Sequence, residues 1–221
     1  MQVKYLGHAC FLLVENDTAI LVDPFLTSNP VATVKAADVT ANYILVSHHH
    51  TDHAEDVAEI AQANGATVIS TAEIAQHFAD LGLTTHAMHI GGKHGFDFGY
   101  VRLTPALHGA GIAGGHACGF VINLFGTVIY HAGDTGLFGD MRLIGELEDL
   151  DLALLPIGDN FTMGVGDAVR AAALLRAPKV IPMHYNTWSL IKADPQAFKQ
   201  QVEEETAAEV IILQPGEELE L

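Results

Sequence analysis

The segment at residues 47–53 constrains the fold of this chain more than any other. Within six positions it contains four residues whose side chains bind metals: His48, His50, Asp52 and His53. The apolar run at 42–46 before it is rich in strand formers, and residues 52–63 after it have helical periodicity. Side chains alternate along a strand, so His48 and His50 share one side. We therefore expect a strand end and a helix start to converge on one metal site. An expression tag also has consecutive histidines, but it lies at a terminus.

The rest of the chain divides into two similar halves, each with a strand-rich block followed by alternating strands and helices. Strands are predicted at 4–6, 9–15, 18–22, 43–47, 67–70, 100–107, 119–125, 127–131, 152–157, 179–183 and 210–213. Helices are predicted at 52–63, 72–81, 141–147, 165–175 and 195–205. Each half would form one mixed sheet with helices outside it. Because no linker composition separates the halves, we expect a single domain over residues 1–221.

Three more predicted strands end at a metal-ligand residue. These residues are His108, Asp134 and His184. Architectures of strands and helices bring several strand ends to one edge of a sheet, where ligand sites form. We therefore expect the three side chains to join the histidine cluster.

The order of these motifs resembles the metallo-β-lactamase superfamily. The match consists of His48-x-His50-x-Asp52-His53, then His108, Asp134 and His184, with Val22-Asp23-Pro24 before them. Further stretches resemble one branch, the small metal-dependent hydrolases similar to ascorbate-6-phosphate lactonases. They are Gly7-His8-Ala9-Cys10, His131-Ala132-Gly133-Asp134-Thr135, Pro-Ile-Gly-Asp-Asn-Phe-Thr-Met-Gly at 156–164 and Pro-Met-His-Tyr-Asn-Thr at 182–187.

The resemblance implies a four-layer αββα sandwich, an α/β fold of two mixed β-sheets flanked by helices, with two divalent metal ions at one edge. It implies that the first ion is bound by His48, His50 and His108, the second by Asp52, His53 and His184, and that Asp134 bridges both. Zinc is the first candidate, and manganese, iron and nickel suit the same ligands. Two adjacent ions lower the pKa of a shared water and supply a bridging hydroxide nucleophile. Asp134 and Asp52 are the expected catalytic residues, with Asp52 or a nearby histidine carrying the proton to the leaving group.

Five further residues are candidates for positioning the ligands or lining the pocket: His8, Asp23, Thr135, Thr162 and Asn186. Asp23 would orient a ligand or the loop beneath the site, and otherwise stabilises a turn. His8 is either a pocket acid or auxiliary ligand, or an ordinary turn histidine. Thr135 is a candidate for orienting the neighbouring aspartate. Thr162 and Asn186 lie in loops at the expected active edge, where capping of a turn is the alternative.

Other conspicuous residues are not assigned to the site. His49 points away from the metals by strand alternation. We interpret His131 and His116 as structural residues. The basic residues near the expected loops, Lys93, Arg102 and Lys192, are interpreted as solvated surface charges and not as a phosphate clamp.

The charge balance limits the partners of the chain. It has 27 acidic and 10 basic residues, a formal net charge of −17. The negative electrostatic field of this charge repels nucleic acid and anionic membranes, so we expect a small-molecule substrate. The N-terminal residues lack a signal-peptide pattern, and the two cysteines read as buried free thiols of a cytoplasmic protein. Homo-oligomerisation stays open.

The leading hypothesis is a cytoplasmic two-metal hydrolase of a small ester, lactone or phosphoester. The first alternative is a phosphodiesterase or nuclease, which the same metal pair supports and which the negative charge disfavours. The second is a non-catalytic metal-binding protein, which requires closed coordination shells. Flavin-dependent redox chemistry is discounted, because 221 residues leave no room for a flavin domain.

Overall fold

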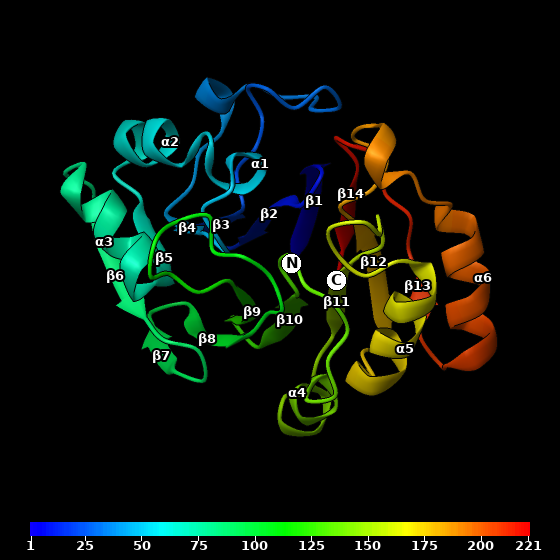
Figure 1. Cartoon of the computed structure of the whole chain (residues 1–221). Helices are drawn as coiled ribbons and strands as arrows, with labels where there is room; N and C mark the ends of the chain where they lie inside the picture. Colours follow the sequence, from blue (N-terminus) through cyan, green and yellow to red (C-terminus); the bar gives the residue numbers. More distant parts are fainter.

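The computed structural model describes residues 1–221, which form two seven-stranded β-sheets with helices on their outer faces (Figure 1). The first sheet has the order β14-β1-β2-β3-β4-β5-β6, and the second has the order β13-β12-β11-β10-β9-β8-β7. Helices α2 and α3 cover the first sheet, and α5 and α6 cover the second (Figure 1). These layers confirm the predicted αββα sandwich.

The first sheet consists of β1 (Gln2–Gly7), β2 (Cys10–Glu15), β3 (Thr18–Val22), β4 (Tyr43–Leu45), β5 (Thr67–Thr71), β6 (Thr85–Met88) and β14 (Glu218–Glu220). The second consists of β7 (Lys93–Phe96), β8 (Gly99–Pro105), β9 (Cys118–Leu124), β10 (Thr127–His131), β11 (Leu152–Pro156), β12 (Lys179–Met183) and β13 (Glu209–Val210). The helices are α1 (Thr51–Ala54), α2 (Val57–Asn64), α3 (Ala72–Asp80), α4 (Met141–Leu147), α5 (Val165–Leu175) and α6 (Pro195–Glu205).

The two halves of the chain repeat one topology. Strands β1, β2 and β3 are antiparallel, and β3 to β6 are parallel. In the second half β7 to β10 are antiparallel, and β10 to β13 are parallel. Since β8 and β10 both run antiparallel to β9, they point the same way. The carboxyl ends of β8, β10, β11 and β12 therefore meet at one edge of the second sheet.

The core lies mainly between the sheets. One apolar cluster of 45 buried residues contains side chains of both sheets, such as Phe11 of β2 and Phe120 of β9. A second cluster of 16 buried residues includes Ile44 of β4, Ile60 of α2 and Phe78 of α3. This division fixes each sheet between two apolar layers, and it leaves the strand ends free to carry polar residues.

The last two helices begin and end as their sequences indicate. Helix α5 buries an apolar face that includes Val169 and Leu175, and it ends at Arg176 in the left-handed conformation. Helix α6 begins with Pro195 in its first turn, and the Asp194 side chain accepts a hydrogen bond from the backbone N–H of Gln196. A proline in the first turn and an aspartate cap are common signals of a helix start.

The helix predicted at 52–63 is broken into α1 and α2. The break lies at Glu55 and Asp56, because both side chains bind the loop that follows β3. The Asp56 carboxylate accepts hydrogen bonds from the backbone N–H groups of Leu26 and Thr27. Helical periodicity does not reveal this long-range contact.

Strands β6, β7 and β14 were not predicted, and the predicted strand at 210–213 is instead β13 at Glu209–Val210. All three unpredicted strands are short, and all three lie at the edges of their sheets, where short strands are common. Cys10 and Cys118 are buried and free, as expected. None of the helices is long and apolar enough to cross a membrane.

The two phenylalanines on and just after β9 test where the stability resides. Phe120 is fully buried in the main cluster, and Phe125 in the following turn is 48% exposed. We expect F120A to lower the free energy of unfolding by about 3–5 kcal/mol, because it leaves a cavity. F125A should change it by less than about 0.5 kcal/mol. Urea denaturation measures both values, and equal losses would contradict this placement of the core.

Candidate metal centre

The candidate metal ligands lie just beyond strand ends of both sheets. His48 and His50 follow β4, His108 follows β8, Asp134 follows β10, and His184 directly follows β12. Their side chains meet at the edge formed by the carboxyl ends of these strands. The topology therefore brings together residues that are up to 136 positions apart, from 48 to 184.

One group of three imidazoles lies on the side of the β4–α1 loop. The ligand atoms of His48, His50 and His108 are all within 4.8 Å of one another. The Nε2 atom of His108 is 3.3 Å from Nδ1 of His50. Such a set of three nitrogens, with room for a further ligand, suits a divalent transition metal.

A second group combines a carboxylate with imidazoles. The ligand atoms of His8, Asp52, His53 and His184 also lie within 4.8 Å of one another. The Oδ2 atom of Asp52 is 3.8 Å from Nε2 of both His53 and His184. His8 was predicted as a pocket acid, an auxiliary ligand or a turn histidine, and it lies within this group.

Asp134 lies between the two groups. Its Oδ1 atom is 3.3 Å from Nε2 of His53. Its Oδ2 atom is 3.0 Å from Nε2 of His184, 3.6 Å from that of His108 and 3.9 Å from that of His48. One carboxylate therefore faces nitrogen atoms of both groups, and its side chain is only 3% exposed.

Several of these buried atoms have no hydrogen-bond partner within the protein. They are Nε2 of His48, Nε2 of His53, Oδ1 of Asp134 and both ring nitrogens of His184. Burying polar atoms without partners is costly, and native proteins rarely do so. Divalent metal ions would satisfy these atoms together, so the residues fit the metal that their chemistry indicates.

Asp23 and Ser47 set the tautomers of two histidines. The Ser47 hydroxyl donates to Oδ2 of Asp23 at 2.6 Å, so its oxygen is left to accept from Nδ1–H of His48 at 2.9 Å. The Nδ1–H group of His53 donates to the same Asp23 oxygen at 2.8 Å. When these rings are neutral, the lone pair of each is thereby left on Nε2, which faces Asp134. The location of Asp23 agrees with the predicted orienting function.

Charge within the site follows from these contacts. Burial lowers the pKa of His48 well below its ordinary value, and burial also lowers that of His108. Burial opposes the charged form of His184, but Asp134 and Asp52 outweigh it and raise its pKa to about 9. Burial likewise opposes charge on His53, and Asp134 and Asp23 raise its pKa well above the ordinary value. Protons on these two rings would compete with metal, so binding should release protons.

His8 connects the β1–β2 turn to the second group. Its Nε2 is 3.2 Å from Oδ2 of Asp52, and its Nδ1 is 2.7 Å from the Thr187 hydroxyl. Its backbone oxygen accepts the N–H of His184 at 2.7 Å. One buried turn thus holds the side chain of Asp52 and the backbone of His184.

The remaining predicted pocket residues lie elsewhere. The Thr135 hydroxyl does not bind Asp134: it accepts the backbone N–H of Leu107 and donates to the oxygen of Gly136, so it fixes the loop before His108. The Thr162 hydroxyl donates to its neighbour's carbonyl, which is turn capping. The Asn186 side chain binds the backbone of Ala193. None of the three lines the cavity above the candidate ligands.

The unassigned histidines also have other partners. His49 points away and packs against His77, with ring centroids 4.4 Å apart. His131 donates from Nε2 to the carbonyl of Ala9 and accepts the N–H of Gly133 on Nδ1, so it is a satisfied core residue. His116 does not line the cavity.

A cavity of about 440 Å³ opens above the candidate ligands. His50, Asp52, His108, Asp134 and His184 line one part of it. Its other walls include four large apolar side chains: Phe25, Phe161, Trp188 and Leu190. None of the four was predicted as a pocket residue, because apolar residues in loops carry no spacing signal. The hints were that Phe161 lies in the motif at 156–164, and that Trp188 is the sole tryptophan and follows the motif around His184.

Comparison with known proteins agrees with this geometry. The model of the β-lactamase superfamily domain matches residues 2–184. The chain belongs to the β-lactamase superfamily. A UPF0173 metal-dependent hydrolase of Natranaerobius thermophilus is 53% identical over 221 residues, covering 100% of both chains. Another, from Pelotomaculum thermopropionicum, is 54% identical over 229 residues with the same coverage.

A solved structure extends the agreement to three dimensions. Igni18, a metallo hydrolase from the hyperthermophilic archaeon Ignicoccus hospitalis, matches with a TM-score of 0.93 and 36% identity, covering 99% of this chain and 97% of the other. Together with the curated relatives it shows that the chain is a metal-dependent hydrolase of the β-lactamase superfamily.

Asp23 provides a test of how the ligands are oriented. We expect D23N to weaken metal binding about 10–100-fold, because an amide has one acceptor oxygen for the three N–H and O–H groups of Ser47 and His53. Asp56 is a matched control, since it is buried and accepts hydrogen bonds only from Leu26 and Thr27. D56N should lower stability without changing affinity, measured by competition with a chelator. Equal affinity losses in both variants would refute the orienting function of Asp23.

The glycine loop against the histidine segment provides a second test. Gly111 and Gly114 both have a left-handed backbone, with φ of +71° and +75°. A Cβ on Gly111 would lie 2.5 Å from the backbone of His49, whereas one on Gly114 meets nothing within 4 Å. Both alanine variants carry backbone strain of about 1–2 kcal/mol. Only G111A should displace His50 and weaken metal binding, by about 10-fold or more. Unchanged affinity in G111A would show that the loop does not hold the segment.

Proposed function

We propose that this metal-dependent hydrolase binds two divalent ions and hydrolyses a small ester, lactone or phosphoester. His48, His50 and His108 would hold one ion, Asp52, His53 and His184 the other, and Asp134 both. The observation that carries the proposal is the position of Asp134, whose two oxygens face Nε2 atoms of both groups. When bound, two adjacent ions lower the pKa of a shared water and so supply hydroxide at neutral pH. Zinc is the first candidate, with manganese, iron or nickel as alternatives.

Asp52 is the best-placed residue to move a proton. Its side chain is 27% exposed and lines the cavity, whereas Asp134 is almost fully buried. Burial opposes its charged form, but the nearby His184 ring and a hydrogen bond with His8 hold the pKa of Asp52 well below its ordinary value. An ionised carboxylate can accept a proton from the attacking water and pass it to the leaving group. His8 and Thr187 hold it in place for this transfer.

The charge of the protein supports a small substrate over a polynucleotide. The net charge is −17, and neither lysine nor arginine lines the cavity. Nucleic-acid binding depends on neutralising phosphates with such residues. A purely structural metal site would be closed, and a 440 Å³ cavity above the candidate ligands argues against that alternative. The free thiols Cys10 and Cys118 support action in a reducing cytoplasm.

Substitution of Asp134 tests the proposal that two bound metal ions support hydrolysis. Protein freed of metal and reconstituted with zinc, manganese, iron or nickel would be assayed on lactones, carboxylic esters, thioesters and phosphodiesters. We expect D134N to lower kcat/KM more than about 1,000-fold, or about 4 kcal/mol, and to reduce the bound metal below two ions per chain. The exposed Asp149 gives the control variant D149N, which should match the unaltered protein. If D134N kept full catalytic activity with an unchanged circular dichroism spectrum, the proposed two-metal mechanism would be wrong.

A further inference from the structure

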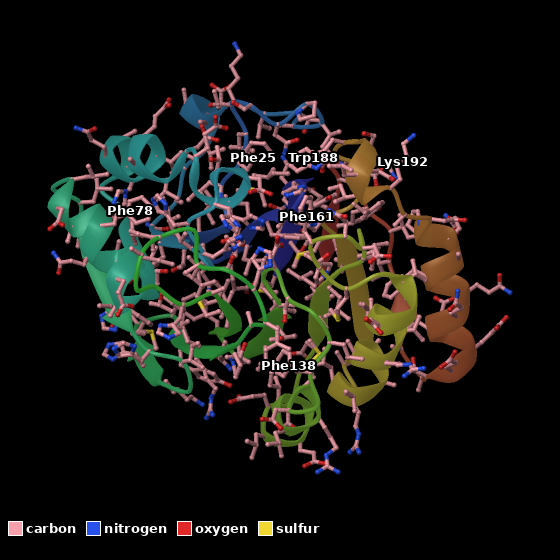
Figure 2. The ribbon with its side chains drawn as sticks, viewed as in Figure 1. Phe25, Phe78, Phe138, Phe161, Trp188 and Lys192 are labelled. Atoms are coloured by element: carbon pink, nitrogen blue, oxygen red, sulfur yellow. The ribbon has the colours of Figure 1, made fainter.

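The apolar walls of the cavity are the least expected feature of this site. Phe25, Phe161 and Trp188 come from loops after β3, β11 and β12, and they lie near one another around the opening (Figure 2). Leu190 follows Trp188 and completes the apolar lining. An apolar wall above polar ligand atoms favours a substrate with one apolar part and one reacting part.

Two of the rings form a fixed platform. Phe25 is buried, and its ring centroid is 6.3 Å from that of Trp188 in an edge-to-face arrangement. The centroid of the indole ring also lies 4.9 Å from that of the His8 ring, and the two ring planes are tilted by 32°. Because His8 in turn binds Asp52, the platform keeps a defined distance from the reacting groups. A rigid aromatic surface binds a flat apolar group at little cost in conformational entropy.

The other two side chains, Phe161 and Leu190, are exposed at the mouth of the cavity, which is its opening to solvent. Leu190 is 64% exposed and Phe161 is 47% exposed, although both are large and apolar. Single exposed apolar residues are common, but these two flank one cavity. A ligand that contacted both would remove apolar surface from water and gain the corresponding free energy.

The cavity offers no basic side chain to a phosphate group. Its lining contains two carboxylates, Asp52 and Asp134, and neither lysine nor arginine. Lys192 is nearby in sequence, but its side chain is exposed and lies outside the lining (Figure 2). Phosphate recognition in proteins generally uses arginine or lysine donors. Divalent ions at the candidate ligands would offset the two carboxylates, but the apolar walls and the net charge of −17 still disfavour a charge on the part of the substrate that lies away from the ligand atoms.

We propose that the substrate is a carboxylic ester or lactone whose ring-sized, uncharged apolar substituent binds between Phe25, Phe161, Trp188 and Leu190. This inference rests on the proposed hydrolytic function and narrows its substrate class. In the reaction, the oxygen of water bonds to the acyl carbon and the bond from that carbon to the alcohol oxygen breaks. One proton of the water ends on the alcohol and the other on the acid.

Trp188 provides a direct readout of cavity occupancy, because it is the only tryptophan of the chain. Its fluorescence would be titrated with three probes that are not hydrolysed readily: acetanilide, acetamide and 4-acetamidobenzoate. We expect acetanilide to change the emission until binding is saturated, at a concentration at least about 10-fold lower than acetamide requires. 4-Acetamidobenzoate carries a carboxylate on the ring, which would lie among the apolar walls, so it should bind at least about 10-fold more weakly than acetanilide. Equal or tighter binding of 4-acetamidobenzoate would overturn the proposal.

Substitutions of Phe161 and Leu190, at the mouth of the cavity, give the second measurement. We expect F161S and L190S each to weaken acetanilide binding about 10-fold and to raise KM for phenyl acetate similarly, while KM for methyl acetate changes little. Matched controls are F125S and L147S, since Phe125 is 48% exposed and Leu147 is 68% exposed, both outside the cavity. Loss of binding in the controls would overturn the assignment. If F161S or L190S changed the oligomeric state and still bound acetanilide as tightly, the mouth would instead be an interface between copies of this chain, and the proposal would be wrong.

The two proposals fail in different ways. If phenyl phosphate is hydrolysed faster than phenyl acetate, the substrate class is wrong but the two-metal hydrolysis stands. If acetanilide binds as expected and no ester, lactone or phosphoester is hydrolysed with any metal, the hydrolytic proposal fails and the substrate assignment fails with it.

Discussion

The concentration of unpaired polar atoms around Asp134 is the constraint on which the rest of this structure depends. A carboxylate that is 3% exposed faces nitrogen atoms of four histidines. Isolated, such a group would be strongly unfavourable in a protein interior. It is tolerated because the neighbouring rings compensate its charge and because the same atoms form a ligand set for divalent ions. The strand ends and loops around the site hold these atoms in place.

The support of the site is built from a few buried hydrogen bonds. Asp23 accepts from Ser47 and His53, and Ser47 accepts from His48, so one carboxylate orients ligands on both sides of the centre. His8 supports only the second group, through the side chain of Asp52 and the backbone of His184. Both residues have a left-handed backbone, at φ of +47° and +59°. Strain of this kind persists where the surrounding structure fixes it, which is common at functional sites.

Much of the site and of the fold could be predicted, for a local reason. Four candidate ligands are close together in the sequence: His48, His50, Asp52 and His53. The other three, His108, Asp134 and His184, each follow an apolar strand. The repeated pattern of strands and helices likewise indicated two mixed sheets. The failures were at Thr135, Thr162 and Asn186, whose hydroxyl or amide groups bind nearby backbone instead of facing the cavity. A polar side chain in a loop has several partners within reach, and the sequence does not rank them.

The amino-acid sequence by itself determined the candidate ligands, two mixed sheets with helices outside them and the strongly acidic charge balance, because these follow from residue type, spacing and periodicity. The packing of the sheets into an αββα sandwich was implied by the resemblance to the metallo-β-lactamase superfamily. Only the tertiary structure decided how the ligands group around Asp134, which tautomers Asp23 and Ser47 impose, and that Phe25, Phe161, Trp188 and Leu190 line one cavity. It also decided the break between α1 and α2, where Asp56 binds a loop 29 or 30 residues away. The physical reason is common to all of these features. They depend on contacts between distant segments, whose geometry exists only after both sheets have packed.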